Sequence, residues 1–261
     1  MLLYHKVLQH ESSDEWVIFV HGAGGSSATF YRQIKDFKKH FNIVMLDLRG
    51  HGRSKDVNQK RPLKNYSFDK VTEDVIEVMD HLKIKEAHFV GVSLGTIINR
   101  ILAEKYPDRV KSLVMGGAIT KMNIRSNTLI NIGNLLKHIV PFSWIYKILA
   151  FIIMPSRYHK ESRNLFIREA KKIYQKEFLR WFKLTKDINP LLRKFKGKPL
   201  KKPALYIMGD EDHLFLETLK RDIGDHQTSQ LIVLDNCGHV CNIDQANEFN
   251  KHSISFLKAC S

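Results

Sequence analysis

The sequence predicts an α/β protein with a mainly parallel sheet, helices on both of its faces, and a helical segment inserted late in the chain. Short apolar runs alternate with stretches of helical spacing up to residue 119 and again from residue 203. Glycine-rich stretches follow several of these runs, at the carboxyl ends of the predicted strands. Sheets of this class hold their active sites at that edge.

The two parts of the predicted sheet are separated by helices. Strands are expected at 1–9, 16–20, 41–46, 87–92, 110–115, 204–208 and 230–234, and helices at 26–40, 67–82, 94–106 and 245–259. Ser67 is placed to cap the second helix. A polar loop is expected to end near Tyr66. We therefore expect residues 1–119 and 203–261 to form the core and residues 120–202 to form a helical cap over the sheet.

The charge of the chain is unusual. Its 42 Lys and Arg residues against 27 Asp and Glu residues give a net charge of +15. Such a charge suits anionic partners, namely nucleic acid, an anionic membrane surface or acidic substrates. The basic residues are spread along the chain and no nucleic-acid-binding motif accompanies them. We therefore expect a generally basic surface and no specific nucleic-acid partner.

The predicted cap is apolar and contains few acids. Leu129 to Met154 is apolar but interrupted by Lys137, Pro141 and Lys147, which favours amphipathic helices. From Arg109 through Lys160 there are eight Lys or Arg residues and no Asp or Glu. The sequence allows two interpretations of these apolar residues. The apolar residues pack the cap on the core, or they make a weak contact with an anionic membrane surface.

The number and positions of the three cysteines indicate the redox state of the cellular compartment. Cys237, Cys241 and Cys260 are odd in number and clustered late, which does not describe a disulfide framework. The first residues lack an apolar signal region, and no uninterrupted apolar run reaches about 18 residues. We therefore expect a cytoplasmic protein.

The candidate nucleophile is Ser93. It lies in the pattern Gly91-x-Ser93-x-Gly95, after an apolar run and before a helical stretch. A serine in a tight turn from strand to helix adopts a strained backbone, so small residues are needed on either side. The turn exposes the hydroxyl and places the Leu94 amide at a helix N-terminus, where an oxyanion can be held.

A serine nucleophile needs a base, and that base needs a carboxylate to orient it. Gly209-Asp-Glu-Asp212 follows one predicted strand and Gly238-His239 follows the last. His21 is expected to brace its loop, and His51 and His213 to lie at the surface or line a pocket. Cys237-Gly-His-Val-Cys241 supplies only three ligands in one short loop, so no metal site is expected. No phosphate-binding glycine motif is present, so no cofactor is expected.

Four motifs occur in an order that resembles the α/β-hydrolase family over nearly the whole chain. They are His21-Gly22 with its glycines, Asp47-x-Arg49-Gly50-x-Gly52-x-Ser54, the turn around Ser93, and Gly209-x-x-Asp212 followed by Gly238-His239. The resemblance implies a sheet of seven or eight strands with an inserted cap. It also implies that Ser93 is the nucleophile, His239 the base and then the acid, and Asp212 the orienting carboxylate, preferred by its spacing over Asp210 and Glu211. The amides of Ala23 and Leu94 would form the oxyanion hole.

The resemblance implies a serine hydrolase of carboxylic esters, with a small or medium, partly hydrophobic small-molecule substrate. Lactones and thioesters would use the same residues. Other members of the family leave alternatives open. One is a lyase of the menaquinone pathway, which carries an arginine where this chain has Ile97. Carbon–carbon bond hydrolases and ligand-binding signalling proteins with little turnover are the others. The oligomeric state is not predicted.

Overall fold

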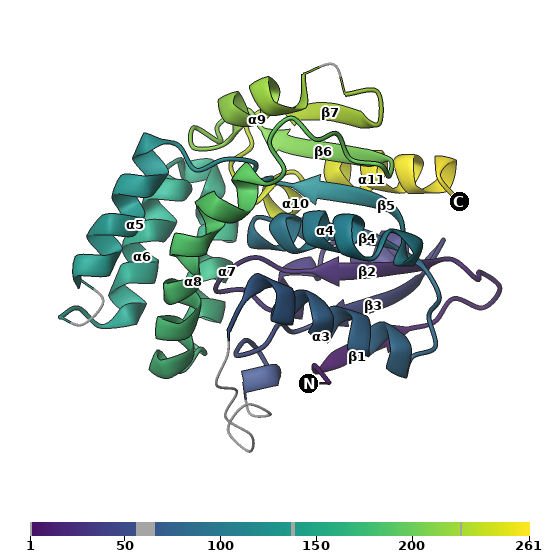
Figure 1. The fold of residues 1–261 in the computed structure, drawn as a ribbon, viewed down its shortest axis with the longest axis horizontal. Coiled ribbons are helices and arrows are strands. Elements are labelled where there is room, and N and C mark those ends of the chain that lie inside the picture. Colours follow the sequence, from purple (N-terminus) through teal and green to yellow (C-terminus); the bar gives the residue numbers. More distant parts are fainter. Residues whose placement is uncertain (1, 56–65, 137–138, 225) are drawn as a thin grey trace.

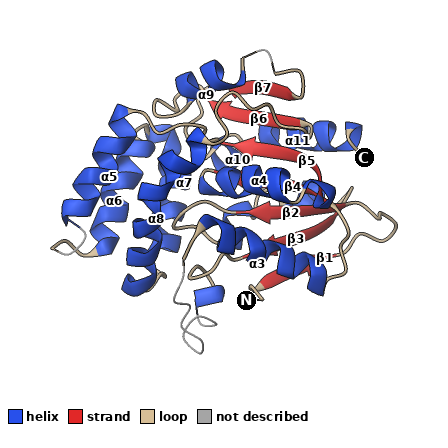
Figure 2. Cartoon of the chain, in the orientation of Figure 1, coloured by secondary structure: helices blue, strands red, loops and turns tan. Residues whose placement is uncertain are grey.

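The computed structural model describes residues 2–55, 66–136, 139–224 and 226–261. In these residues the strands are His5–Leu8 (β1), Trp16–Val20 (β2), Asn42–Leu46 (β3), Ala87–Val92 (β4), Val110–Gly116 (β5), Ala204–Gly209 (β6) and Ser229–Leu234 (β7). They form one seven-stranded sheet in the order β1-β3-β2-β4-β5-β6-β7. Only β1 is antiparallel to its neighbour among these strands, which confirms the mainly parallel sheet (Figures 1 and 2).

Helices connect most of these strands. They are Ile34–Phe37 (α1), Phe68–His81 (α3), Leu94–Lys105 (α4), Ile124–Leu136 (α5), Phe142–Ile153 (α6), Lys160–Ala170 (α7), Gln175–Arg193 (α8), Leu216–Ile223 (α9), Cys241–Asp244 (α10) and Ala246–Ala259 (α11), with short 3-10 turns at Ser27–Phe30 (η1), Pro107–Arg109 (η2) and Arg157–His159 (η3). The Ser67 hydroxyl accepts a hydrogen bond from the Lys70 amide at the start of α3, as the sequence predicts.

Two expectations need qualification. The stretch 26–40 forms η1 and α1 instead of one helix. Between them, the Tyr31 and Gln33 amides bond to carbonyls three residues back instead of four, which tightens the backbone there. The buried Gln33 side chain donates to the Asn242 carbonyl and to the Asn250 side chain. The polar loop expected before Tyr66 lies mostly in 56–65, outside the described residues.

Apolar side chains cover both faces of the sheet. On β2, Ile18 and Val20 join a core formed with α3, α4 and α9. Val17 and Phe19 point to the opposite face and join a core formed with α1 and α11. A strand buried on both faces needs a continuous apolar run rather than an alternating one, which explains the sequence of β2.

Four helices, α5 to α8, lie between β5 and β6 in the chain, and we call residues 124–193 the helical insertion. The insertion lies beyond the carboxyl ends of the strands (Figure 1). It has a small apolar cluster of its own, which includes Tyr146 and Phe178. It also contacts the core through Trp181, whose indole N–H donates to the Arg49 carbonyl over 2.9 Å. Among the described residues, each helix is too short or too polar to cross a bilayer.

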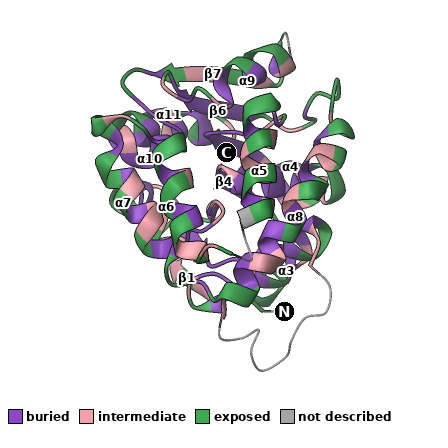
Figure 3. Ribbon diagram, turned by 90° about the vertical axis from the view of Figure 1, so that its left-hand side faces the viewer, coloured by how far each residue is buried: buried purple, intermediate pink, exposed green. Residues whose placement is uncertain are grey.

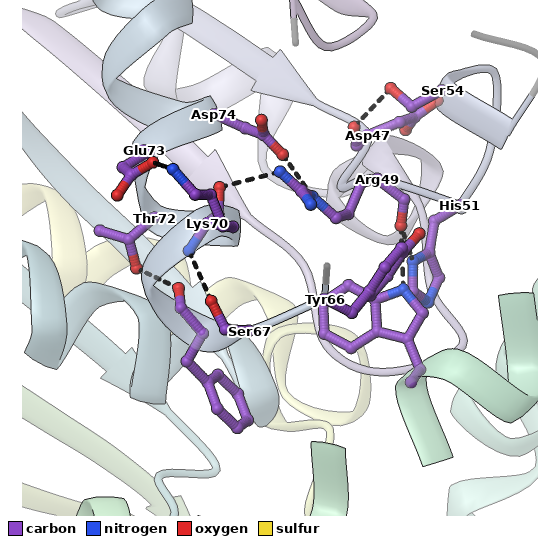
Figure 4. A network of polar contacts seen from close by, with 12 residues as sticks. Asp47, Arg49, His51, Ser54, Tyr66, Ser67, Lys70, Thr72, Glu73 and Asp74 are labelled. Atoms are coloured by element: carbon purple, nitrogen blue, oxygen red, sulfur yellow. Dashed lines mark hydrogen bonds and ion pairs between the residues drawn. The ribbon is translucent and has the colours of Figure 1, made fainter. Parts of the chain in front are cut away.

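The motif from Asp47 to Ser54 folds the loop after β3. Both carboxylate oxygens of Asp47 accept backbone amides, from Ser27 and Arg53. The Arg49 guanidinium lies 2.6 Å from the carboxylate of Asp74 on α3, and both side chains are 3% exposed (Figure 4). A buried ion pair is expensive to break because the remaining charge has no solvent around it.

We expect Asp74→Ala to lower the free energy of unfolding by about 3–5 kcal/mol, because it leaves the Arg49 charge buried beside an empty site. Asp69→Ala is the matched control, since Asp69 pairs with Lys105 at the surface and should cost less than about 1 kcal/mol. Urea unfolding followed by circular dichroism measures both. Equal losses in the two variants would contradict this account of Arg49.

Candidate active site

Ser93 lies between β4 and α4 with φ 56° and ψ −120°, a conformation that residues with a Cβ rarely adopt. The glycines on either side permit it. A Cβ on Gly91 would lie 2.9 Å from the Gly95 carbonyl, and a Cβ on Gly95 would overlap the carbonyl oxygen of Val20 on β2. The small residues expected beside Ser93 are therefore required, in part because the helix passes so close to the neighbouring strand.

Three side chains from distant parts of the chain form a hydrogen-bonded row. The Ser93 Oγ lies 2.8 Å from the His239 Nε2, and the His239 Nδ1 lies 2.7 Å from the Asp212 Oδ2. The other oxygen of Asp212 accepts the Phe215 amide. Asp212 and His239 are buried, whereas Ser93 is partly exposed. Acceptance by Asp212 requires a proton on Nδ1, which leaves Nε2 free to take the serine proton.

The two other acids of the Gly209–Asp212 loop have different partners. The Asp210 carboxylate accepts the Cys237 amide over 3.0 Å and so ties this loop to the one that carries His239. The Glu211 carboxylate lies 3.2 Å from the His159 ring. Of these three carboxylates, the structure thus brings only Asp212 to the His239 ring.

The two amides expected to hold an oxyanion belong to segments that run next to Ser93. Leu94 is the first residue of α4, and Ala23 lies in the loop after β2, next to Gly22. A Cβ on Gly22 would lie 3.0 Å from the Ser93 Cβ, so this loop runs against the serine. The amides of Gly24 and Gly25 already have acceptors. Within the described residues, neither the Ala23 nor the Leu94 amide has an assigned protein acceptor.

Two buried histidines hold the loop that carries Ala23. The His21 Nε2 accepts the Leu48 amide, and the His51 Nε2 accepts the Gly24 amide. Since a backbone N–H can only donate, both Nε2 atoms must be unprotonated. His21 braces its loop as the sequence suggests. His51 does not lie at the surface, because it is fully buried against Trp181. His213 is exposed.

The cysteines near His239 belong to the core. The Cys237 and Cys241 side chains are fully buried, and burial raises the pKa of each thiol. Their thiols contact different carbonyls, those of Gly238 and Ile207 respectively. Protonated thiols make poor nucleophiles and poor metal ligands. Among the described residues, His, Cys, Asp and Glu form no group of three able to hold a metal ion.

Sequence reasoning missed two residues that support this site. The Phe215 ring lies 5.2 Å from the His239 ring, centre to centre. His159, at the end of η3 in the insertion, is fully buried and would contact any Cβ placed on Gly238. Phe215 follows Asp212 closely, so its position could have been anticipated. His159 is about 80 residues from His239, and no local pattern relates the two.

Comparisons with known proteins identify the fold. Residues 15–138 match the family model of the alpha/beta hydrolase fold. The chain is 30% identical over 106 residues to 3-oxoadipate enol-lactonase 2 of Acinetobacter baylyi, an alignment covering 41% of this chain and 38% of that enzyme. The chain spans half or less of the length of the first curated relatives it matches.

Solved structures resemble the chain over nearly all of its length. The enol-lactonase from Burkholderia xenovorans has a TM-score of 0.82 and 22% identity, covering 98% of this chain and 96% of that one. The meta-cleavage product hydrolase from Pseudomonas fluorescens has a TM-score of 0.77 and 23% identity, covering 98% and 94%. At such identities the likeness establishes the fold, and it confirms the fold class predicted from the sequence.

The backbone strain at Ser93 can be measured. Strain of this kind costs about 1–3 kcal/mol, whereas the added flexibility of glycine in the unfolded chain costs about 0.5–1 kcal/mol. We therefore expect Ser93→Gly to be more stable to urea than Ser93→Ala by about 1 kcal/mol. Both variants lack the hydroxyl, so the comparison isolates the backbone. A Ser93→Gly protein that is no more stable than Ser93→Ala would show that the backbone at Ser93 is not strained.

The buried histidines predict loss of stability in acid. Burial lowers the pKa of His51 to about 3 and also lowers that of His21, whereas the ordinary value is 6.5. As pH falls below about 6.5 the unfolded chain takes up protons that the folded chain refuses, so stability present at neutral pH is lost. At about pH 5.5 the loss is about 1.4 kcal/mol for His51, and His21 contributes a loss of the same sign.

Urea unfolding at about pH 7.5 and about pH 5.5 measures this loss. His51→Asn should reduce the difference between the two pH values by about 1.4 kcal/mol. His213→Asn, at an exposed position, is the control and should leave the difference unchanged. An equal pH dependence in wild type and His51→Asn would show that His51 does not contribute.

Proposed function

Since the chain belongs to the α/β-hydrolase superfamily, we propose that it is a serine hydrolase that cleaves carboxylic esters through an acyl-enzyme on Ser93. The observation that carries the proposal is the row Ser93–His239–Asp212, with contacts of 2.8 and 2.7 Å, at a strained turn. A serine hydroxyl becomes a competent nucleophile when a neutral imidazole accepts its proton, and Asp212 stabilises the imidazolium that results.

The proposed reaction has two halves. The Ser93 Oγ attacks the ester carbonyl carbon while His239 takes the hydroxyl proton, and the carbonyl oxygen becomes an anion held by the Ala23 and Leu94 amides. His239 then gives its proton to the departing alkoxide as the carbon–oxygen bond breaks. Water, deprotonated by His239, attacks the acyl-enzyme, and the Ser93 oxygen leaves with the returned proton.

The surroundings of the site favour a small substrate with an apolar part. A cleft of about 470 Å³ separates α5 from α6 and is lined by Leu129 and Ile153 together with Leu214, two residues after Asp212. We propose that residues 120–202 act as a cap and that this cleft leads towards the site. Similarity to enol-lactonases makes cyclic esters the first substrates to test.

The three cysteines are unpaired, which supports a reducing, cytoplasmic location.

The proposal predicts that Ser93→Ala and Asp212→Asn lose activity. Asp212→Asn should reduce kcat on a short-chain p-nitrophenyl ester by about 10⁴-fold, because it removes the charge that stabilises the imidazolium. Asp210→Asn is the matched control. It lies on the same loop but bonds the Cys237 amide, so it should retain most of the activity.

A fluorophosphonate probe and a panel of lactones complete the test. Mass spectrometry should find the probe on Ser93 and on no residue of Ser93→Ala. Faster turnover of lactones than of open-chain esters would favour a lactonase. Wild-type protein that neither reacts with the probe at Ser93 nor turns over esters would refute the serine-hydrolase proposal and favour a ligand-binding protein.

A further inference from the structure

The outer surface of α5 and α6 is unusually apolar. Eight of the thirteen exposed large hydrophobic residues in the described part of the chain lie between 124 and 152: Ile124, Ile132, Leu135, Ile139, Trp144, Ile148, Phe151 and Ile152. We call these eight residues the apolar face. Soluble surfaces scatter such residues singly, and a concentration of them marks an interaction site.

These side chains are largely exposed, whereas packing of the cap against the core would bury them. Ile124 is 85% exposed, Leu135 is 76% exposed and Trp144 is 61% exposed. On α6 the exposed residues Trp144, Ile148, Phe151 and Ile152 recur at helical spacing, so one side of the helix is apolar and open. Packing of the cap on the core therefore does not account for these residues.

The two helices present this face together. Ile124 of α5 and Ile152 of α6 line the same cleft. Figure 3 views the molecule from the side of the insertion and shows exposed residues along both helices. The exposed apolar residues of both helices thus lie at the end of the molecule farthest from the amino ends of the strands (Figure 1), and those of α5 and α6 meet at the cleft through Ile124 and Ile152.

The charged residues of α5, α6 and the segments that flank them in the sequence have one sign, and the acid beside them in space, Asp222 of α9, lies next to Lys121 and Ile124. Lys121, Arg125, Lys147, Arg157 and Lys160 are exposed in or beside α5 and α6, and none has a carboxylate partner among the described residues. No Asp or Glu occurs between residues 109 and 160. Helices that lie in the headgroup region of anionic bilayers combine exposed apolar and aromatic side chains with cations in or beside the helix.

We propose that the apolar face docks this protein on an anionic membrane surface, with Trp144 and Phe151 inserted among the lipid headgroups and Arg125 and Lys147 bound to lipid phosphates. A second copy of the chain fits the surface less well. A two-fold symmetric contact places the same patch on both sides, so these cations would face each other without an acid between them. A lipid bilayer supplies both an apolar interior for the side chains and negatively charged headgroups for the cations.

The test uses the full-length protein and large vesicles of phosphatidylcholine, with or without an equal part of phosphatidylglycerol. A basic protein adheres to anionic vesicles in any case, so apolar insertion must be separated from charge. Trp144→Ser/Phe151→Ser should lower the partition coefficient at least about tenfold. Leu2→Ser/Val233→Ser, at exposed apolar positions elsewhere, is the matched control and should bind like wild type.

A second pair of variants tests the charge. Arg125→Glu/Lys147→Glu and Lys6→Glu/Lys38→Glu lower the net charge equally, and all four positions are exposed. The first pair should weaken binding at least about tenfold more than the second. Equal effects of the two pairs would show adhesion without a defined surface and would overturn the proposal.

Trp144 also reports its own insertion. It is exposed, whereas Trp181 is buried and Trp16 half-buried, and the chain has no other tryptophan. Brominated phosphatidylcholine in the anionic vesicles should quench the fluorescence of wild type but not of Trp144→Phe, which should still bind. Binding without quenching would overturn the proposal.

Sedimentation velocity of the same variants distinguishes a second copy from a membrane. A dimer that Trp144→Ser/Phe151→Ser dissociates, with vesicle binding unchanged, would show that the face is covered by another copy. None of these measurements requires turnover, so their outcome is independent of the proposed hydrolysis.

Discussion

The close approach of the Ser93 turn to the sheet is the constraint on which the site depends. With φ at 56°, the backbone turns sharply enough that α4 starts against β2, and Gly95 lies where a Cβ would overlap the Val20 carbonyl. A methyl group there would push the helix away from the strand. The Leu94 amide and the Ser93 hydroxyl would move with it, because α4 begins at Leu94 and Ser93 directly precedes it.

The same constraint recurs in the loops that bring the other two side chains to Ser93. A Cβ on Gly117 would overlap the His239 carbonyl, and a Cβ on Gly209 would overlap the carbonyl of Cys237. These loops follow β5, β6 and β7, which are adjacent in the sheet. Close backbone contact at three strand ends is what allows His239 to reach a serine 146 residues away in the sequence.

Local patterns predicted the sheet well because its inner strands, β2 to β6, are almost entirely buried on both faces and most of them read as continuous apolar runs. The placement of the candidate site followed from the strands as well: Ser93, Asp212 and His239 each lie within five residues of the end of a predicted strand, and the carboxyl ends of parallel strands meet at one edge. The single helix expected at 26–40 was wrong in detail, since the backbone around Tyr31 and Gln33 bonds three residues back and the Gln33 side chain is held by Asn242 and Asn250, contacts that no local pattern reveals. The burial of His51 was missed because Trp181, which covers it, is 130 residues away.

Local sequence patterns also could not predict which way the polar side chains of the insertion point. Its buried acids face the core: Glu169 accepts the Ser26 hydroxyl, and Glu177 accepts the Tyr66 hydroxyl. Trp181 adds a hydrogen bond to the Arg49 carbonyl. Helical periodicity identifies an apolar side and a polar side but not which of them faces the core.

In α7 and α8 acids and an indole N–H are directed inward, whereas in α5 and α6 isoleucine, leucine, tryptophan and phenylalanine are directed outward. An exposed apolar side chain does not gain the free energy of burial, which is about 1.5–3 kcal/mol for each large side chain that is fully buried. A sequence under no other demand would place polar residues at Trp144 and Phe151, as it does on the exposed side of α8 with Lys183 and Lys186. The contrast between helices of one insertion supports the proposal that α5 and α6 meet a different surrounding from α8, and the lack of acids within α5 and α6 suits a negatively charged one.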